Sequence, residues 1–180
     1  MNTDGTNDTN YIRDSSPDEE KAIWDLLESV CDPEVPVLSV IDLGIVRKIE
    51  TGPIPGSVSV TLTPTYSGCP AMEVISRDIY RVLQHAGHKD IQIRTVLSPA
   101  WTTDWISDKG KDKLKAFGIA PPLPGQQVCH TRLFHEEEAI PCPRCNSYDT
   151  RMISRFGSTP CKALYQCKAC QEPFDYFKCH

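Results

Sequence analysis

The sequence predicts an α+β protein made of two units, a small mixed helix-and-strand domain followed by a zinc ribbon. Three observations predict this class. Helical and strand periodicities alternate through the first two thirds of the 180 residues. A proline-rich segment interrupts them near residue 120, and two Cys-x-x-Cys pairs follow it. The predicted order is helix, two strands, helix, strand, helix and then the ribbon.

The first helix has clear start and stop signals. Residues 16–19 form a capping box with Pro at the first helical position, and Asp32-Pro33 should stop the helix. Its predicted apolar face consists of Ala22, Ile23, Leu26, Leu27 and Val30.

Three strands and a second helix should follow. Residues 45–50 and 57–63 read as strands around the turn-rich residues 51–56, which predicts a hairpin. Residues 69–86 have a helical apolar face and begin with a Cys-Pro pair. The strand over residues 91–97 should then return beside an earlier strand by a right-handed crossover.

A last helix ends the first unit. Ser107 or Asp108 should start it, and Gly118 should end it. The next segment, APPLPG, is too rich in proline for regular structure and therefore predicts a linker. The expected organisation is a disordered polar tail over residues 1–15, the mixed domain over 16–120, the linker over 121–138 and the zinc ribbon over 139–180.

Charge and composition exclude several classes of protein. Residues 139–180 contain six Lys or Arg and three acids, so subtracting their +3 from the net charge of −5 leaves −8 for residues 1–138. A unit this acidic is unsuited to binding nucleic acid. Every apolar run is too short to cross a membrane, and the N-terminus does not resemble a secretory signal. We therefore expect a cytoplasmic protein that binds neither membrane nor nucleic acid.

Four cysteines have the spacing of a structural zinc site. Cys142 and Cys145 form one pair, and Cys167 and Cys170 form the other. Each pair places two thiolates on one tight turn, and two such turns supply four soft ligands. Nine cysteines in a reducing compartment favour metal ligation over disulfides, and their odd number agrees. We expect zinc at these four residues, arranged in a three-stranded ribbon.

Cys69 is the second candidate for chemistry. It lies at the start of a predicted helix, where unpaired backbone N–H groups favour a negative charge. The hydroxyl-rich residues 63–68 before it could also stabilise a thiolate or a bound metal. This pattern predicts an unusually accessible thiolate. A reactive or metal-binding cysteine and a plain capping cysteine both fit the pattern.

Several segments resemble a known family. Residues 32–46, DPEVPVLSVIDLGIV, and residues 63–70, TPTYSGCP, resemble the SufT-like iron–sulfur assembly domain. Residues 98–105, 117–122 and 156–179 are similar to one branch of it, the family of the D-type subunit of phenylacetyl-CoA epoxidase. In that branch, the assembly domain is fused to a C-terminal zinc ribbon. The family's characteristic cysteine corresponds to Cys69.

The resemblance implies an accessory protein rather than an enzyme. It implies a maturation or targeting factor for the iron–sulfur or di-iron centres of the multicomponent phenylacetyl-CoA 1,2-epoxidase of phenylacetate degradation, with the oxygenase and reductase subunits as partners. The sequence agrees, because it lacks the Glu-x-x-His pairs of a di-iron bundle and the Cys-x4-Cys-x2-Cys run of a ferredoxin. The alternatives are a stoichiometric interaction subunit and a thiol-dependent enzyme centred on Cys69.

Other residues are candidates for supporting roles. Cys69 offers one exchangeable soft ligand for transient iron or an iron–sulfur cluster, and Asp32, Glu34 or Asp42 could add oxygen ligands. The same three acids could instead cap a helix, face solvent and hold a turn. A possible second metal site consists of Cys129, His130, Cys161 and Cys179, although Cys161 and Cys179 could simply be buried beside the zinc ligands.

Aromatic residues are predicted both in the core and at a surface. Trp101 and Trp105 are four residues apart, so they could share a helical face and, with Phe117, form a docking surface. Packing in the core is the alternative. The ribbon contains more aromatic residues than so small a unit can bury, so some of them should contact the first unit or a partner.

Overall fold

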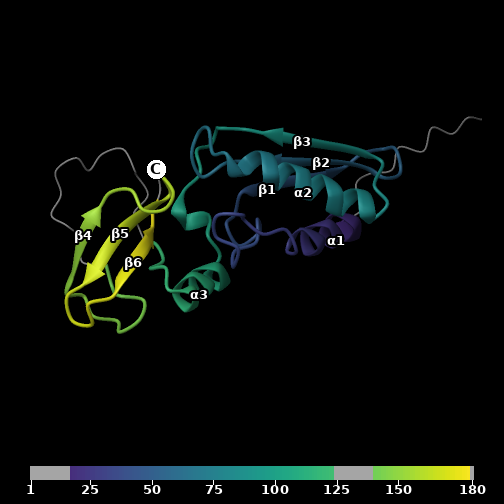
Figure 1. Cartoon of the computed structure of the whole chain (residues 1–180). Coiled ribbons are helices and arrows are strands. Elements are labelled where there is room, and N and C mark those ends of the chain that lie inside the picture. The colour runs from purple at the N-terminus through teal and green to yellow at the C-terminus, as the bar shows by residue number, and fades with distance from the viewer. Residues whose placement is uncertain (1–16, 124–139, 179–180) are drawn as a thin grey trace, which may run out of the picture.

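The structure is a computed structural model that describes residues 17–123 and 140–178 (Figure 1). The order of its elements confirms the predicted α+β class. In chain order they are α1 (Pro17–Leu27), β1 (Val46–Thr51), β2 (Ser57–Leu62), α2 (Ala71–His85), β3 (Asp90–Thr95), a 3-10 helix (Thr103–Trp105), α3 (Asp108–Phe117), β4 (Thr150–Ser154), β5 (Lys162–Cys167) and β6 (Pro173–Phe177).

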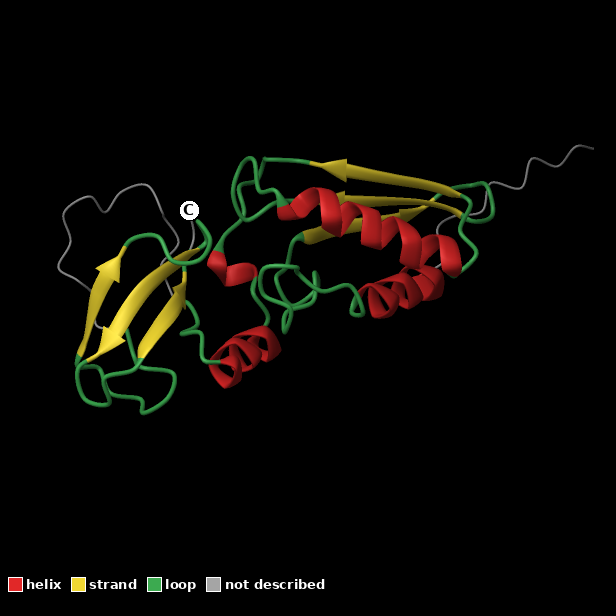
Figure 2. Ribbon diagram, in the orientation of Figure 1, coloured by secondary structure: helices red, strands yellow, loops and turns green. Residues whose placement is uncertain are grey.

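The first unit is a three-stranded sheet with helices on one face. β1 pairs antiparallel with β2, and β2 pairs in parallel with β3, so β2 is the central strand. Val58, Val60 and Leu62 of β2 are buried, as their alternation predicts. Figure 2 shows α1 and α2 on the same side of this sheet. The apolar core is formed by buried residues of α1, α2, β1 and β2.

The first helix is shorter than predicted. It ends at Leu27, and the next turn is closed by bonds from Ser29 N–H to Leu26 C=O and from Val30 N–H to Leu27 C=O. The Ser29 hydroxyl also donates to Leu26 C=O at 2.7 Å, which competes with helical hydrogen bonding. Val30 is nevertheless buried. The start of the capping box, Ser16, lies outside the described residues.

A close backbone contact joins the loop after α1 to the segment before α3. Gly44 has a φ of 65°, and a Cβ atom there would lie 2.2 Å from the Trp105 carbonyl oxygen. Only glycine fits this position. The Trp101 indole N–H donates to Leu43 C=O at 2.9 Å and is buried.

The two tryptophans do not share a helical face. Trp101 precedes the 3-10 helix and is buried in the core, whereas Trp105 is half-buried beneath the Arg47 guanidinium, 3.5 Å from the ring centroid. Phe117, at the end of α3, is 55% exposed. The predicted core role therefore holds for Trp101.

Helix α3 begins and ends where the sequence predicts. The Ser107 hydroxyl accepts a hydrogen bond from Gly110 N–H at 2.9 Å, and Gly118 adopts the left-handed conformation after the last turn. No described helix is long and apolar enough to cross a membrane.

The ribbon is an antiparallel sheet of order β4-β5-β6 that contacts the first unit directly. Ala120 N–H donates to Asp175 C=O at 2.8 Å, and Phe177 N–H donates to Ala120 C=O at 2.9 Å. The Phe177 ring meets Trp101 edge-on, with 6.3 Å between centroids. Phe177 and Cys161 are buried in the core of the first unit. The ribbon thus contributes two side chains to the other core.

Candidate metal centres

The four ribbon cysteines converge on one point. The Sγ atoms of Cys142 and Cys170 are 3.8 Å apart, and those of Cys145 and Cys167 are 3.6 Å apart. All four sulfur atoms lie within 4.8 Å of one another. Two sulfurs bound to one tetrahedral zinc ion at about 2.3 Å are separated by about 3.8 Å. The number, type and spacing of these ligands therefore fit a structural zinc ion.

Each cysteine pair is shaped by a tight turn. Asn146 and Gln171 follow the two pairs with φ values of 60° and 64°, and Asn146 N–H donates to Cys142 C=O at 2.9 Å. Cys170 N–H donates to Cys167 Sγ at 3.5 Å, and this bond is the largest of several causes that lower the pKa of that thiol to about 7. The backbone thus favours the thiolate at Cys167, whereas burial and neighbouring thiols raise the pKa values of Cys145 and Cys170.

Cys69 lies in a loop between β2 and α2. Gly68 has a φ of 83°, and the Cys69 N–H donates to Tyr66 C=O across the turn, at 3.4 Å. Helix α2 begins two residues later, at Ala71. The Cys69 side chain is half-buried. The predicted position at a helix start is confirmed.

The predicted ionisation of Cys69 is wrong. Burial raises the pKa of this thiol, and the charges of Glu34 and Asp32 raise it further. Hydrogen bonds from the Ala71 N–H and from Tyr66 lower the pKa but do not outweigh burial. Without a bound cation, Cys69 is a neutral thiol near pH 7.

Asp32 fixes the loop that carries Glu34. The Asp32 Oδ1 atom accepts hydrogen bonds from Glu34 N–H at 2.7 Å and from Val35 N–H at 2.8 Å, and Val35 is buried. Burial raises the Asp32 pKa, while these two bonds and the charge of Lys162 lower it. Asp32 therefore acts as a backbone anchor, and Glu34 is the acid of this loop whose carboxylate is not used in those bonds.

Cys161 is the described member of the predicted second site. Its Sγ atom lies 3.8 Å from Glu34 Oε2 and 3.1 Å from Thr159 Oγ1, and the residue is 5% exposed. Cys129, His130 and Cys179 lie outside the described residues. The expected burial is confirmed, but Cys161 packs into the first unit rather than beside the zinc ligands. The structure therefore brings Cys161 close to Glu34.

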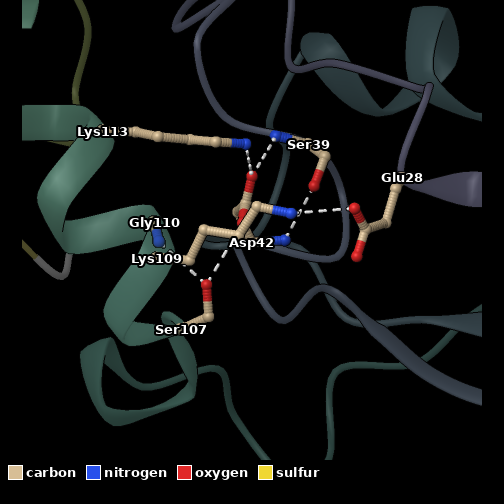
Figure 3. A network of polar contacts seen from close by, with 7 residues as sticks. All are labelled: Glu28, Ser39, Asp42, Ser107, Lys109, Gly110 and Lys113. Atoms are coloured by element: carbon tan, nitrogen blue, oxygen red, sulfur yellow. Dashed lines mark hydrogen bonds and ion pairs between the residues drawn. The ribbon is translucent and has the colours of Figure 1, made fainter. Parts of the chain in front are cut away.

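Asp42 belongs to a different network. Figure 3 shows its carboxylate between the loop after α1 and helix α3. Oδ2 accepts from Ser39 N–H at 3.1 Å and pairs with Lys113, while Oδ1 accepts from the Ser107 hydroxyl at 3.2 Å. Burial would raise the Asp42 pKa, but the bonds from Lys113 and Ser39 outweigh it and lower the pKa below its usual value. This carboxylate holds α3 in place and does not join Cys69.

Asp42→Asn is expected to destabilise the fold by about 3 kcal/mol near neutral pH, because it leaves Lys113 without its partner in a partly buried network. A depressed folded-state pKa stabilises the protein above the unfolded pKa and loses that contribution as pH falls through the folded value. The difference in urea midpoint between the two proteins should therefore shrink below about pH 4. Asp112→Asn, an exposed change on the same helix, is the control. Equal midpoints for Asp42→Asn and wild type would contradict this role.

The comparisons with known proteins agree with this arrangement. Residues 20–94 match the family described as iron–sulfur cluster assembly protein, and residues 126–178 match the PaaD zinc beta ribbon domain. The first unit therefore matches the assembly family and the ribbon matches the zinc ribbon domain, as the sequence resemblance implied.

A relative from Escherichia coli (strain K12), provisionally named as the D-type subunit of 1,2-phenylacetyl-CoA epoxidase, is 46% identical over 164 residues. The match spans 91% of this chain and 95% of that protein. The chain therefore belongs to the family of this epoxidase component.

Two shorter matches cover the first unit. An Fe-S protein maturation auxiliary factor of Porphyromonas gingivalis is 36% identical over 91 residues, which span 50% of this chain and 85% of that protein. The crystal structure of a DUF59 domain from Bacillus anthracis is 28% identical with a TM-score of 0.49, covering 53% of this chain and 90% of that chain.

Proposed function

We propose that this protein is a cytoplasmic accessory factor that matures or targets the iron–sulfur or di-iron centres of a multicomponent phenylacetyl-CoA 1,2-epoxidase in phenylacetate degradation. Its partners are the oxygenase and reductase subunits, and it does not itself catalyse the epoxidation. The observation that carries the proposal is a half-buried thiol, Cys69, on an assembly-type domain within a chain related to an epoxidase subunit over almost its whole length.

Two kinds of sulfur support this role. Cys142, Cys145, Cys167 and Cys170 offer four ligands already gathered around one point, which suits a permanent zinc ion that stabilises the ribbon. Cys69 offers a single thiol that becomes a strong ligand only when a cation displaces its proton. A carrier of iron or of a cluster needs ligands that release their cargo, so the transfer step belongs to Cys69.

The name of the Escherichia coli relative favours one alternative, a stoichiometric subunit of the epoxidase complex. In that role the ribbon binds the oxygenase, and no metal is delivered. The two functions differ in what happens to the metal content of the oxygenase and reductase when this chain is altered. Metal content is therefore the measurement that separates them.

Cys69→Ser is expected to leave the protein folded while its clients accumulate with several-fold less iron. The oxygenase and reductase are co-expressed with wild type, Cys69→Ser or Cys31→Ser, purified without oxygen and assayed for iron and labile sulfide. Cys31 is an exposed thiol in a β-bridge with Ser39, so Cys31→Ser is the matched control. Serine retains the size of the side chain but is a weaker ligand for iron.

The outcomes separate the functions. Iron-deficient clients with Cys69→Ser and full clients with Cys31→Ser support maturation. Fully metallated clients with Cys69→Ser contradict it. Co-purification at fixed stoichiometry, with fully metallated clients that are inactive without this chain, would establish the stoichiometric subunit instead. Substrate turnover by the isolated protein, abolished in Cys69→Ser, would favour a thiol-dependent enzyme.

A further inference from the structure

Strand β3 is the outer strand whose edge is least protected among the strands that the structure describes. The register of the outer strand β1 is interrupted between Val46 and Lys48, and that of the outer strand β4 between Met152 and Ser154. Ala120 pairs with the outer edge of β6. β3 pairs with β2 over six residues without an interruption, and no described strand lies beyond it (Figure 1). A straight and uncovered edge readily pairs with another strand.

The free edge of β3 presents the backbone groups of alternate residues. Val96 N–H, directly after the strand, donates to Leu62 C=O of β2 at 2.8 Å. Backbone groups of successive strand residues point alternately to the two edges of the strand. The even-numbered residues of β3 therefore face β2, and Ile91 and Ile93 direct their N–H and C=O groups outward. These are the groups that a further strand would bond.

The side chains of β3 are complementary to those of a second copy of the same strand. Asp90, Gln92 and Arg94 lie on one face of β3, and the two charges are equally spaced about Gln92. Two antiparallel β3 strands related by a two-fold axis at Gln92 would place Asp90 of each copy opposite Arg94 of the other. Ile91 of each copy would then lie opposite Ile93 of the other. Opposite charges and apolar side chains both stabilise such cross-strand pairs.

Both charges are available for this contact. The Asp90 Oδ2 atom accepts from the Ser57 hydroxyl at 3.1 Å, and the Arg94 guanidinium donates to the Gln92 Oε1 atom at 2.9 Å. Both hydrogen bonds are exposed, and both join a charged group to a neutral side chain. Each charge can therefore still pair with an opposite one across the edge.

The charges also select one arrangement of the two strands. Moving the two-fold axis by one residue in either direction places Asp90 opposite Gln92 or Val96, so the opposite charges no longer meet. Parallel pairing in register would place Asp90 beside Asp90 and Arg94 beside Arg94. Like charges directly opposite one another are destabilising. The antiparallel pair centred on Gln92 is therefore the favoured one.

We propose that the edge of β3 is a dimer interface, at which two copies of this chain join their three-stranded sheets into one six-stranded sheet. The contact is two-fold symmetric, so the same residues serve both copies. Ile91 and Ile93 are half-buried and pack against the core of the first unit, so pairing extends that apolar layer across the interface. The inference does not rest on the proposed function, because no metal ligand takes part in it.

Reversing one charge at a time tests the interface. The oligomeric state of full-length, zinc-loaded protein is measured by sedimentation over a range of concentrations, and wild type should dimerise. Asp90→Arg and Arg94→Asp should each weaken dimerisation by about tenfold or more, because two attractive pairs become repulsive. Lys48→Asp reverses a charge on the exposed side of β1 and should match wild type. Each variant should keep one zinc ion and remain folded.

Two combinations of these variants should restore the dimer. The double variant Asp90→Arg/Arg94→Asp exchanges the two charges and should dimerise like wild type. An equimolar mixture of the two single variants should form a heterodimer, because one copy then carries two positive charges at these positions and the other two negative ones. Failure of both combinations would overturn the proposal, as would a monomeric wild type or a dimer that the single variants leave unchanged.

Hydrogen exchange of unaltered protein is a measurement that no misfolded variant can affect. The amide protons of Ile91 and Ile93 should exchange more slowly as the protein concentration rises, because they enter hydrogen bonds between copies. The amides of Gln92 and Arg94 face β2 in the monomer and should change less. Exchange at Ile91 and Ile93 that does not depend on concentration would overturn the proposal. Slowing caused by an added oxygenase or reductase alone would assign the edge to a partner's strand and would also overturn it.

Discussion

Cys167→Ser is expected to unfold the ribbon while the first unit keeps its structure. The residue is fully buried, and it is one of four sulfurs that must gather around one ion. Among the described residues, the buried core of the ribbon consists of eight, one of which is Ala120 of the first unit, so three short strands depend on the metal for most of their stability. Zinc binding contributes about 10–16 kcal/mol to sites of this kind. The free energy lost on removing one ligand should therefore exceed the folding stability of the ribbon.

The result can be read by NMR or by limited proteolysis. Signals of β4, β5 and β6 should collapse to unfolded positions, and those of β1, β2 and β3 should remain dispersed. Removal of zinc from wild type by a strong chelator should give the same spectrum, and Cys31→Ser should give the wild-type spectrum. A folded ribbon in zinc-free wild type would show that the quartet is not a structural metal site.

Phe177→Ala is expected to loosen the contact between the units at a cost of about 3–5 kcal/mol. The ring is 1% exposed and packs edge-on against Trp101 in the core of the first unit. Truncation leaves a cavity at the point where the ribbon enters that core. The backbone bonds of Ala120 to β6 remain, so the ribbon should stay attached but less rigid.

Denaturant unfolding followed by tryptophan fluorescence tests this change. Wild type should unfold in one transition, and Phe177→Ala should unfold at lower denaturant in two. Tyr148→Ala removes an aromatic ring that is 64% exposed and should stay within about 0.5 kcal/mol of wild type. A Phe177→Ala midpoint equal to that of Tyr148→Ala would mean that the two units do not stabilise each other.

Local patterns predicted the fold well. The helix at Asp108–Phe117 has its serine cap and its glycine stop, and the zinc-type quartet follows directly from two Cys-x-x-Cys pairs. These features depend on residues that are close in sequence or on ligand chemistry that recurs among unrelated proteins. A capping serine or a Cys-x-x-Cys pair indicates the same local structure in most proteins.

Long-range features could not be predicted in this way. Cys161 meets Glu34 across 127 positions of sequence, and no local pattern indicates which way the ribbon faces. The same limit applies to Lys162, which approaches Asp32 and was not among the predicted residues. The Cys69 pKa was predicted in the wrong direction because burial of the thiol raises its pKa, and the Ala71 N–H at the helix start does not offset that effect. Tertiary packing decided each of these cases.

Strand β5 fixes the separation between Cys161 and the zinc-type cysteines. Cys161 directly precedes the strand, and Cys167 is its last residue. Six residues of extended chain span about 20 Å, so the strand holds the two cysteines at a fixed separation of about that length. Cys161 therefore cannot join the zinc-type quartet by a small shift of side chains, and its thiol stays in the core of the first unit.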